Sequence, residues 1–223
     1  MPSMRLSTSQ GVLAATESLP SGATLVIHDC SWESYEQLLD SIGDRPGLRI
    51  SYDHGRLEIL SPSRKHERYS RIPDLIVAIY CEIRGLKCEL YGHTTWKLKG
   101  VSKGVEPDAC YYVRNAERVI GETEIRLESH PPPDIAVEID MTNSSLQKFV
   151  IYSALSVPEI WRFDGRTFTF YALEDGKYAE IPESRQLPGF TGAMLLEAIQ
   201  DSEKRGQTAA LKAFRQRLHK SKR

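Results

Sequence analysis

The chain is predicted to be an α/β domain in which a mixed β-sheet has helices packed against it. Three observations favour this class. Segments with apolar residues at three- and four-residue steps, as in helices, alternate along the chain with short β-prone runs. One of these runs, DIAVEI at residues 134–139, is almost continuously apolar, which indicates a strand buried on both faces. Two further pairs of strand-like runs are each joined by a short turn that contains glycine.

In the first half of the domain, a helix is predicted over residues 31–43, because Ser31 can cap its first turn and a glycine can end it. The strand-like runs LRISYD and RLEILS follow, joined by a turn at residues 53–55, and predict a β-hairpin. Residues 66–84 then carry apolar side chains at helical spacing. Pro73 lies within that helix and predicts a kink or a later start.

In the second half, strands are predicted at the runs KCELYG, TTWKL, ACYYV and DIAVEI. A helix is expected over residues 146–155, and a second hairpin is expected from EIWRF and TFTFYAL, which flank a turn at residues 164–165. A short helix over residues 192–200 completes the domain. This order of elements predicts a mixed sheet with helices against it.

The two ends differ from the middle in composition. Residues 1–22 are rich in Ser, Thr and Gly without periodicity, which predicts a flexible N-terminal arm before a domain at residues 23–200. Residues 201–223 are predicted to form a basic helix or tail, since from position 204 onward there are eight Lys and Arg residues and no acid. Such a segment could neutralise DNA phosphates, improve solubility or pack on a partner subunit.

Composition excludes several classes of protein. The chain has 223 residues, of which 40% are hydrophobic and 26% charged, as in ordinary globular domains rather than disordered or fibrous chains. No stretch approaches the roughly 20 apolar residues that span a bilayer, and the first ten residues lack the apolar centre of a signal peptide. The four cysteines lack CxxC spacing, which disfavours zinc. We therefore expect a cytoplasmic protein with no membrane segment.

Two acidic residues stand at positions that favour a metal site. Asp108 follows Pro107, which interrupts strand pairing just before it, and Glu138 comes at the end of the apolar run DIAVEI. A buried carboxylate is costly unless it is paired or binds a metal. Two carboxylates at adjacent strand ends, completed by water, are ligands that Mg²⁺ prefers. A cation held there could activate water for phosphodiester hydrolysis.

A family resemblance rests on residues in a fixed order. In sequence order they are Pro107, Asp108, Glu138, Lys148, Tyr152 and the run VPEIW at residues 157–161. This order resembles that of the Uma2 (DUF820) restriction-endonuclease family, and the segment GRLEILSPSRKHER at residues 55–68 resembles the part before its long helix. The resemblance covers residues 24–196, and the ordered combination is far more specific than the Pro-Asp pair alone.

The resemblance implies a restriction-endonuclease-like fold of the PD-(D/E)xK class, a Mg²⁺ or Mn²⁺ site and DNA as substrate. The implied metal ligands are Asp108, Glu138 and the carbonyl oxygen of Ile139. The implied surroundings are Glu67 or Glu58 as an outer carboxylate and His66 as a proton carrier or substrate contact.

Position 140 departs from the nuclease pattern. The pattern has Lys two residues after the Glu, where its ammonium orients the attacking water, and this chain has Asp140 instead. Either Lys148 reaches back into the site as a migrated lysine, or Asp140 itself acts as an acid or base. We favour Lys148, because a second carboxylate beside Glu138 adds repulsion without supplying positive charge. Ser144 stands where relatives often carry an acid four residues before the lysine, which weakens the case for a fully active site.

Structural explanations stay open for the same residues. The two acids could cap a turn and end a solvent-facing strand, and Lys148 could be a solvated helix residue. His66 and Glu67 could simply begin a helix, where an acidic residue is favoured. The aromatic residues Tyr152 and Trp161 are predicted to belong to the core rather than to the site.

Three functions follow from this pattern. The leading hypothesis is a metal-dependent endonuclease that hydrolyses DNA phosphodiester bonds and works as a homodimer, so that two sites cut two strands. The alternative is a catalytically impaired DNA-binding or scaffolding member of the same fold, motivated by Asp140 and Ser144. A weaker alternative is a hydrolase of RNA or nucleotides that shares the metal chemistry.

Overall fold

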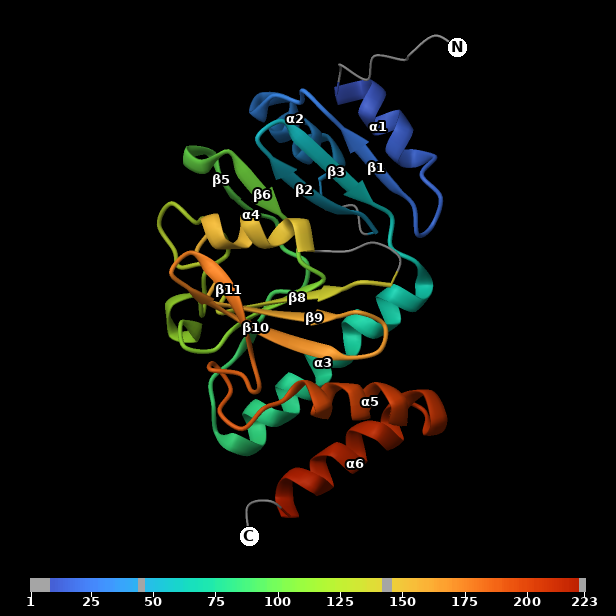
Figure 1. The fold of residues 1–223 in the computed structure, drawn as a ribbon, viewed down its shortest axis with the longest axis vertical. Helices are drawn as coiled ribbons and strands as arrows, with labels where there is room; N and C mark the ends of the chain where they lie inside the picture. The colour runs from blue at the N-terminus through green and yellow to red at the C-terminus, as the bar shows by residue number, and fades with distance from the viewer. Residues whose placement is uncertain (1–8, 44–46, 142–145, 221–223) are drawn as a thin grey trace.

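Two β-sheets organise the part of the chain that the structure describes (Figure 1). The computed structural model describes residues 9–43, 47–141 and 146–220. One sheet has six strands and the other five, and helices pack against both. This architecture confirms the predicted α/β class, although the sequence did not indicate that the strands divide between two sheets.

The six-stranded sheet is mixed. Its strands are β4 (Glu89–Leu90), β7 (Ala109–Tyr112), β8 (Ile135–Ile139), β9 (Glu159–Phe163), β10 (Phe168–Glu174) and β11 (Lys177–Ile181). They lie in the order β11-β10-β9-β8-β7-β4, with β8 and β9 parallel and the other neighbours antiparallel. All residues of β8 are buried, as its apolar run predicted, and β9 and β10 form the predicted hairpin. Strand β11 was not predicted, because the run KYAEI carries charges and has no apolar alternation.

The five-stranded sheet is antiparallel. Its strands are β1 (Thr24–Ile27), β2 (Arg49–Asp53), β3 (Arg56–Leu60), β5 (Trp96–Leu98) and β6 (Lys103–Val105), in the order β1-β3-β2-β6-β5. Strands β2 and β3 form the predicted hairpin, and its turn needs positive φ at His54 (44°) and Gly55 (90°). Strand β6 is too short to predict. Its Gly104 is required, because a Cβ there would overlap the hydroxyl of Tyr35.

The helices largely follow the predicted periodicity. The α-helices are α1 (Ser9–Glu17), α2 (Trp32–Ile42), α3 (Arg64–Arg84), α4 (Phe149–Ala154), α5 (Gly192–Arg205) and α6 (Gln207–Lys220), with 3₁₀ turns η1 (Lys99–Val101), η2 (Ala116–Arg118) and η3 (Leu146–Lys148). Ser31 caps α2 as predicted, and Ser63 caps α3, which begins two residues before the predicted start. Helix α3 runs through Pro73, so the later start does not occur. None of the described helices is both long and apolar enough to cross a membrane.

Helices lie at both ends of the part of the chain that the structure describes, and the C-terminal one, α6, falls in the segment predicted to be a basic helix or tail. Helix α1 forms within the segment expected to lack regular structure, and its Val12 is buried against the apolar cluster that α2 shares with the five-stranded sheet. At the other end, α6 buries Ala210, Phe214 and Leu218 at helical spacing. The apolar side chains of α1 become buried only through tertiary contacts, which explains why local periodicity did not reveal this helix.

The basic C-terminal segment is therefore a packed helix. Arg215 pairs with Glu82 at 3.0 Å, and Arg217 pairs with Glu197 at 2.9 Å. These acids neutralise part of the positive charge within the protein. Contact between α6 and DNA stays a prediction.

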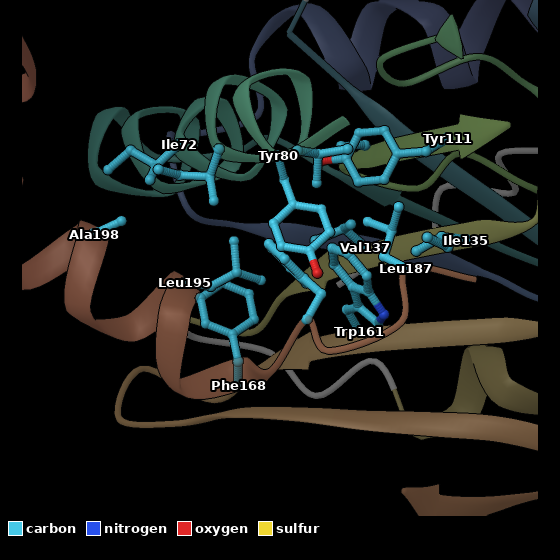
Figure 2. Close-up of a cluster of buried hydrophobic side chains, with 14 of the residues drawn as sticks. Ile72, Tyr80, Tyr111, Ile135, Val137, Trp161, Phe168, Leu187, Leu195 and Ala198 are labelled. Carbon is cyan, nitrogen blue, oxygen red and sulfur yellow. The ribbon is translucent and has the colours of Figure 1, made fainter. Parts of the chain in front are cut away.

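The six-stranded sheet is covered differently on its two faces. Helices α3, α5 and α6 pack on one face, where Tyr80, Val137 and Trp161 belong to one apolar cluster (Figure 2). Helix α4 lies on the other face (Figure 1), where Ala136 and Ile160 pack in a second cluster. Because side chains alternate along a strand, Glu138 falls on the α4 face.

Candidate active site

The predicted acids lie side by side where β7 begins and β8 ends. The two strands are antiparallel with Ala109 opposite Val137, and the backbone N–H of Asp108 donates to the carbonyl of Val137 at 2.9 Å. Asp108 therefore lies beside Glu138, on the α4 face of the sheet. These two residues are 6% and 2% exposed, so neither is a solvent-facing strand end. The structure thus brings two carboxylates together in a buried place.

Three neighbours surround the carboxylate of Asp108. Its Oδ2 accepts the N–H of Ile139 at 2.7 Å, and its Oδ1 accepts Nε of Arg49 at 3.1 Å. Nε2 of the buried His66 lies 3.1 Å from Oδ2, although without the direction of a hydrogen bond. Burial alone would raise the pKa of Asp108, but His66 and the nearby cations outweigh burial and hold this pKa below its usual value. Asp108 is therefore ionised at neutral pH.

The carboxylate of Glu138 is held by two residues that follow it in the chain. Nζ of Lys148 donates to Oε2 at 2.8 Å, and the hydroxyl of Tyr152 donates to Oε1. The pKa of Glu138 is raised to about 7. Burial is the main cause, the negative charge of Asp108 adds to the rise, and Lys148 opposes it. Burial would lower the pKa of Lys148, but the two carboxylates raise it overall, so Lys148 stays an ammonium.

Lys148 and Tyr152 reach Glu138 together because they lie four residues apart at the start of α4. The side chain of Lys148 is 13% exposed, so it is not the solvated helix residue considered above. Tyr152 was predicted to be a core aromatic alone. It is fully buried, but its hydroxyl also belongs to the site, and the K-x-x-x-Y spacing was the available signal. Trp161 lies in the core as predicted.

Arg49 is a site residue that the sequence did not reveal. It lies on β2, in the five-stranded sheet, and its side chain is 3% exposed. Besides Asp108, it donates from Nη2 to Oε1 of Glu67 at 2.9 Å and from Nη1 to the carbonyl of Leu48 at 3.0 Å. Glu67 thus contacts the carboxylate pair through Arg49. No local pattern could predict this link, since Arg49 and Asp108 are 59 residues apart.

Asp140 has a cation of its own. The parallel pairing of β8 and β9 places Arg162 opposite Glu138, and Nε of Arg162 donates to Oδ2 of Asp140 at 2.5 Å. The negative charge at the position of the motif lysine is therefore paired on the neighbouring strand. Ser144, the other departure from the pattern, lies outside the described residues.

A cavity of about 200 Å³ lies between α4 and the β2–β3 hairpin. Lys148, Glu58 and Arg56 are among the residues that line it. Glu58 borders the same cavity as Lys148, and its carboxylate accepts a hydrogen bond from Nη2 of Arg56 at 2.7 Å. The cavity gives a ligand a route to the ammonium of Lys148.

The oxygen donors of the site fit a hard cation. Among the residues that the structure describes, no group of three or more His, Cys, Asp or Glu side chains is placed to hold a metal ion. Asp108 and Glu138 supply two carboxylates, and carbonyl or water oxygens can complete a Mg²⁺ site. Each of their oxygens already accepts a hydrogen bond, but a carboxylate oxygen has a second lone pair.

Comparison with known proteins identifies the family. The profile of the Uma2 family, described as "Putative restriction endonuclease", matches residues 32–202, which include every residue of the site. No curated protein matches the chain. Among solved structures, the chain is similar to "a putative nuclease belonging to DUF820 from Anabaena variabilis ATCC 29413", with 13% identity and a TM-score of 0.40 over 60% of this chain and 78% of that chain. The Uma2 profile matches well over half of the sequence, so the chain belongs to the Uma2 family, as the order of its motifs predicted.

Proposed function

We propose that the chain is an endonuclease that hydrolyses DNA phosphodiester bonds with a divalent metal. The observation that carries this proposal is the buried pair Asp108 and Glu138, with the ammonium of Lys148 2.8 Å from the second carboxylate. Carboxylates for a cation and a lysine for an anionic phosphate are the groups that this chemistry needs. Membership of a family described as restriction endonucleases supports the same reaction class.

The metal would be Mg²⁺ or Mn²⁺, held by Asp108, Glu138 and the carbonyl oxygen of Ile139. Carboxylate and carbonyl oxygens are hard donors, which these ions prefer. When bound, such an ion neutralises charge on a phosphate and lowers the pKa of water. The N–H of Ile139, 2.7 Å from Oδ2 of Asp108, fixes the direction of this carboxylate.

We assign the role of the motif lysine to Lys148. Its ammonium is held at Glu138, so it places positive charge beside the carboxylate pair, where it would stabilise negative charge on the phosphate. Asp140 is the less suitable acid or base, because its carboxylate accepts a hydrogen bond from Arg162 at 2.5 Å.

His66 and Glu67 would act around the carboxylate pair. His66, 3.1 Å from Asp108, is placed to carry a proton or to contact the substrate. Glu67 would be an outer carboxylate that acts through Arg49, which it contacts at 2.9 Å. Glu58 borders the cavity beside Lys148, so its role would be limited to adding negative charge near that ammonium.

A second candidate function is DNA binding or scaffolding without cleavage. Two observations favour it: an acid, Asp140, stands at the position of the motif lysine, and Arg49 contacts Asp108 where the metal would bind. A protein of this kind would bind Mn²⁺ and DNA but would not cut. Hydrolysis of RNA or nucleotides is a further alternative. It would use the same residues as DNA cleavage and differ only in the substrate.

Cleavage of supercoiled plasmid DNA in Mg²⁺, Mn²⁺ or EDTA tests the proposal. Asp108→Asn and Glu138→Gln preserve side-chain shape and remove charge, and Glu180→Gln on the exposed surface of β11 is the matched control. We expect nicking that requires metal, disappears in both site variants and persists in the control. Mn²⁺ binding by the intact protein without cleavage would favour the second candidate, and cleavage of RNA alone would favour the third.

We also propose that the protein acts as a homodimer, because a two-fold pair of sites can cut both strands of a duplex. Sedimentation equilibrium at micromolar protein concentration should give the mass of a dimer. A monomer with and without duplex DNA would contradict this part of the proposal.

A further inference from the structure

Arg49 joins the two sheets at the site through a buried ion pair and also pairs with the partly exposed Glu67 on α3. Its Nε lies 3.1 Å from Oδ1 of Asp108, and both side chains are 3% exposed. Its Nη2 lies 2.9 Å from Oε1 of Glu67, whose side chain is 37% exposed. Charges that are removed from water interact strongly and are poorly screened by salt. Arg49 therefore contributes, together with His66 and Lys148, to the charge that a ligand of Asp108 meets.

Each of the two buried carboxylates already forms an ion pair with one cationic side chain. Arg49 contacts Asp108, and Lys148 contacts Glu138. With Glu67 included and all three acids ionised, three carboxylates and two cations give this group a formal charge of −1. A dication would change that charge to +1 in a place that water hardly reaches, which costs free energy. Loosening the contact of one of the two cations would reduce this cost.

We propose that Arg49 is a positioning residue that competes with the divalent metal for the carboxylate of Asp108. The inference rests on the metal site of the proposed function. In the metal-free protein, the guanidinium of Arg49 stands in for the metal as the counter-ion of Asp108 and holds this carboxylate in place. When a metal binds, the guanidinium withdraws from Asp108 and stays paired with Glu67.

Arg49 is better placed to withdraw than Lys148. Its guanidinium already contacts a second acid, Glu67, and the carbonyl of Leu48, so it keeps two partners after it leaves Asp108. The ion pair of Lys148 is with Glu138, itself a proposed metal ligand. The partly exposed Glu67 also gives the guanidinium access to solvent and to a phosphate.

Binding of Mn²⁺ alone, measured by electron paramagnetic resonance, tests the inference. We expect Arg49→Met to bind Mn²⁺ about tenfold tighter than the wild type, because the competing cation is gone. Arg162→Met is the control: it removes a partly buried arginine, 18% exposed, that pairs with the neighbouring Asp140, and Mn²⁺ binding by this variant should stay within about twofold of the wild type. Mn²⁺ binding by Arg49→Met that is equal to or weaker than that of the wild type would overturn the inference, since a residue that merely supports the site would weaken metal binding when removed.

Thermal unfolding covers the case in which Arg49→Met is unstable in EDTA. Mn²⁺ should raise the Tm of this variant more than that of the wild type, because the metal replaces the missing counter-ion. An equal or smaller rise would contradict competition. Glu67→Gln gives a milder test at a partly exposed position: without its second partner Arg49 should hold Asp108 more firmly, and Mn²⁺ binding should weaken about threefold. Unchanged Mn²⁺ binding in Glu67→Gln would contradict the competition between Arg49 and the metal for Asp108.

None of these measurements uses DNA. A protein that binds Mn²⁺ but does not cut can still show the tighter binding of Arg49→Met, which would support the inference while the proposed cleavage fails. Metal-dependent cleavage by the wild type without that tightening would leave the proposed function intact and reject the role of Arg49.

Discussion

Buried carboxylates at the two ends of the parallel strands β8 and β9 are satisfied in different ways. At the end where β8 finishes, Asp108 and Glu138 each contact a charged side chain that comes from outside their own strand. At the end where both strands begin, Asp134 and Glu159 are held by N–H groups. All four are buried, so burial by itself does not distinguish a candidate active site from a structural acid.

Asp134 shows the structural arrangement. Its carboxylate accepts the backbone N–H of Val113 at 2.7 Å, the backbone N–H of Asn115 at 2.9 Å and the side-chain amide of Asn115 at 2.7 Å. These donors belong to the loop that follows β7. The acid therefore fastens this loop to the start of β8.

Glu159 has the same role at the start of β9. It accepts Nε1 of Trp161 at 2.5 Å and the backbone N–H of Arg185 at 2.9 Å. Burial raises the pKa of Glu159, and these hydrogen bonds oppose the rise. The acid of the VPEIW run thus supports the fold and lies at the other end of the β8–β9 pair from Glu138.

The two groups of acids differ in whether the hydrogen-bond partner of the carboxylate can move away. Backbone N–H groups are fixed by the fold and leave a buried acid with no exchangeable partner. Long cationic side chains can move, and a metal ion can replace them. Buried acids that contact mobile cations are the ones to test for function.

Lys148→Met should have the largest effect on activity and would sharpen the comparison. If cleavage is observed, its rate should fall roughly 1,000-fold, because a positioned donor for the developing charge is lost. Binding of Mn²⁺ should be retained, which gel assays of cleavage and resonance measurements of binding can show together. Lys177→Met, on the exposed surface of β11, is the control. Unchanged cleavage in Lys148→Met would refute the migrated lysine.

Asp134→Ala should have the largest effect on stability. Three N–H groups near β7 would lose their acceptor, which we expect to lower the free energy of unfolding by about 4 kcal/mol. Urea denaturation in EDTA measures this loss. The folded variant should bind Mn²⁺ within about twofold of the wild type. A folded Asp134→Ala protein that has lost metal binding would break the distinction between the two groups of acids.

The pH dependence of stability should reveal the raised pKa of Glu138. The pKa of Glu138 is raised from 4.5 to about 7 in the folded, metal-free protein, so the folded state binds this proton more tightly than the unfolded chain does. The resulting stability is complete below pH 4.5 and is lost as pH rises through about 7, which amounts to up to about 3 kcal/mol.

Urea denaturation in EDTA between pH 4.5 and 8 tests this dependence on the wild type and on Glu138→Gln. The wild type should lose stability relative to the variant as pH rises, because the variant has no proton to release at this position. Parallel stability profiles for the two proteins would show that Glu138 does not titrate in this range.

Much of the fold could be predicted because local patterns carry it. The N-cap Ser31, the turn at His54 and Gly55 and the continuous apolar run of β8 all specify structure within a few residues. Strands β6 and β11 could not be predicted in this way. They are short or polar, and pairing with β2 and β10 makes them strands.

By itself, the sequence determined most of the elements, the order of Asp108, Glu138 and Lys148, and the placement of Tyr152 four residues after Lys148, because these depend on periodicity and on neighbours along the chain. Only the tertiary structure decided that Arg49 pairs with Asp108 and that Arg162 pairs with Asp140. Partners of this kind come from different strands, and strand register and sheet packing decide which side chains meet. Of the charges that surround the candidate metal site, Lys148 is therefore given by the motif, whereas the two arginines are placed by the fold.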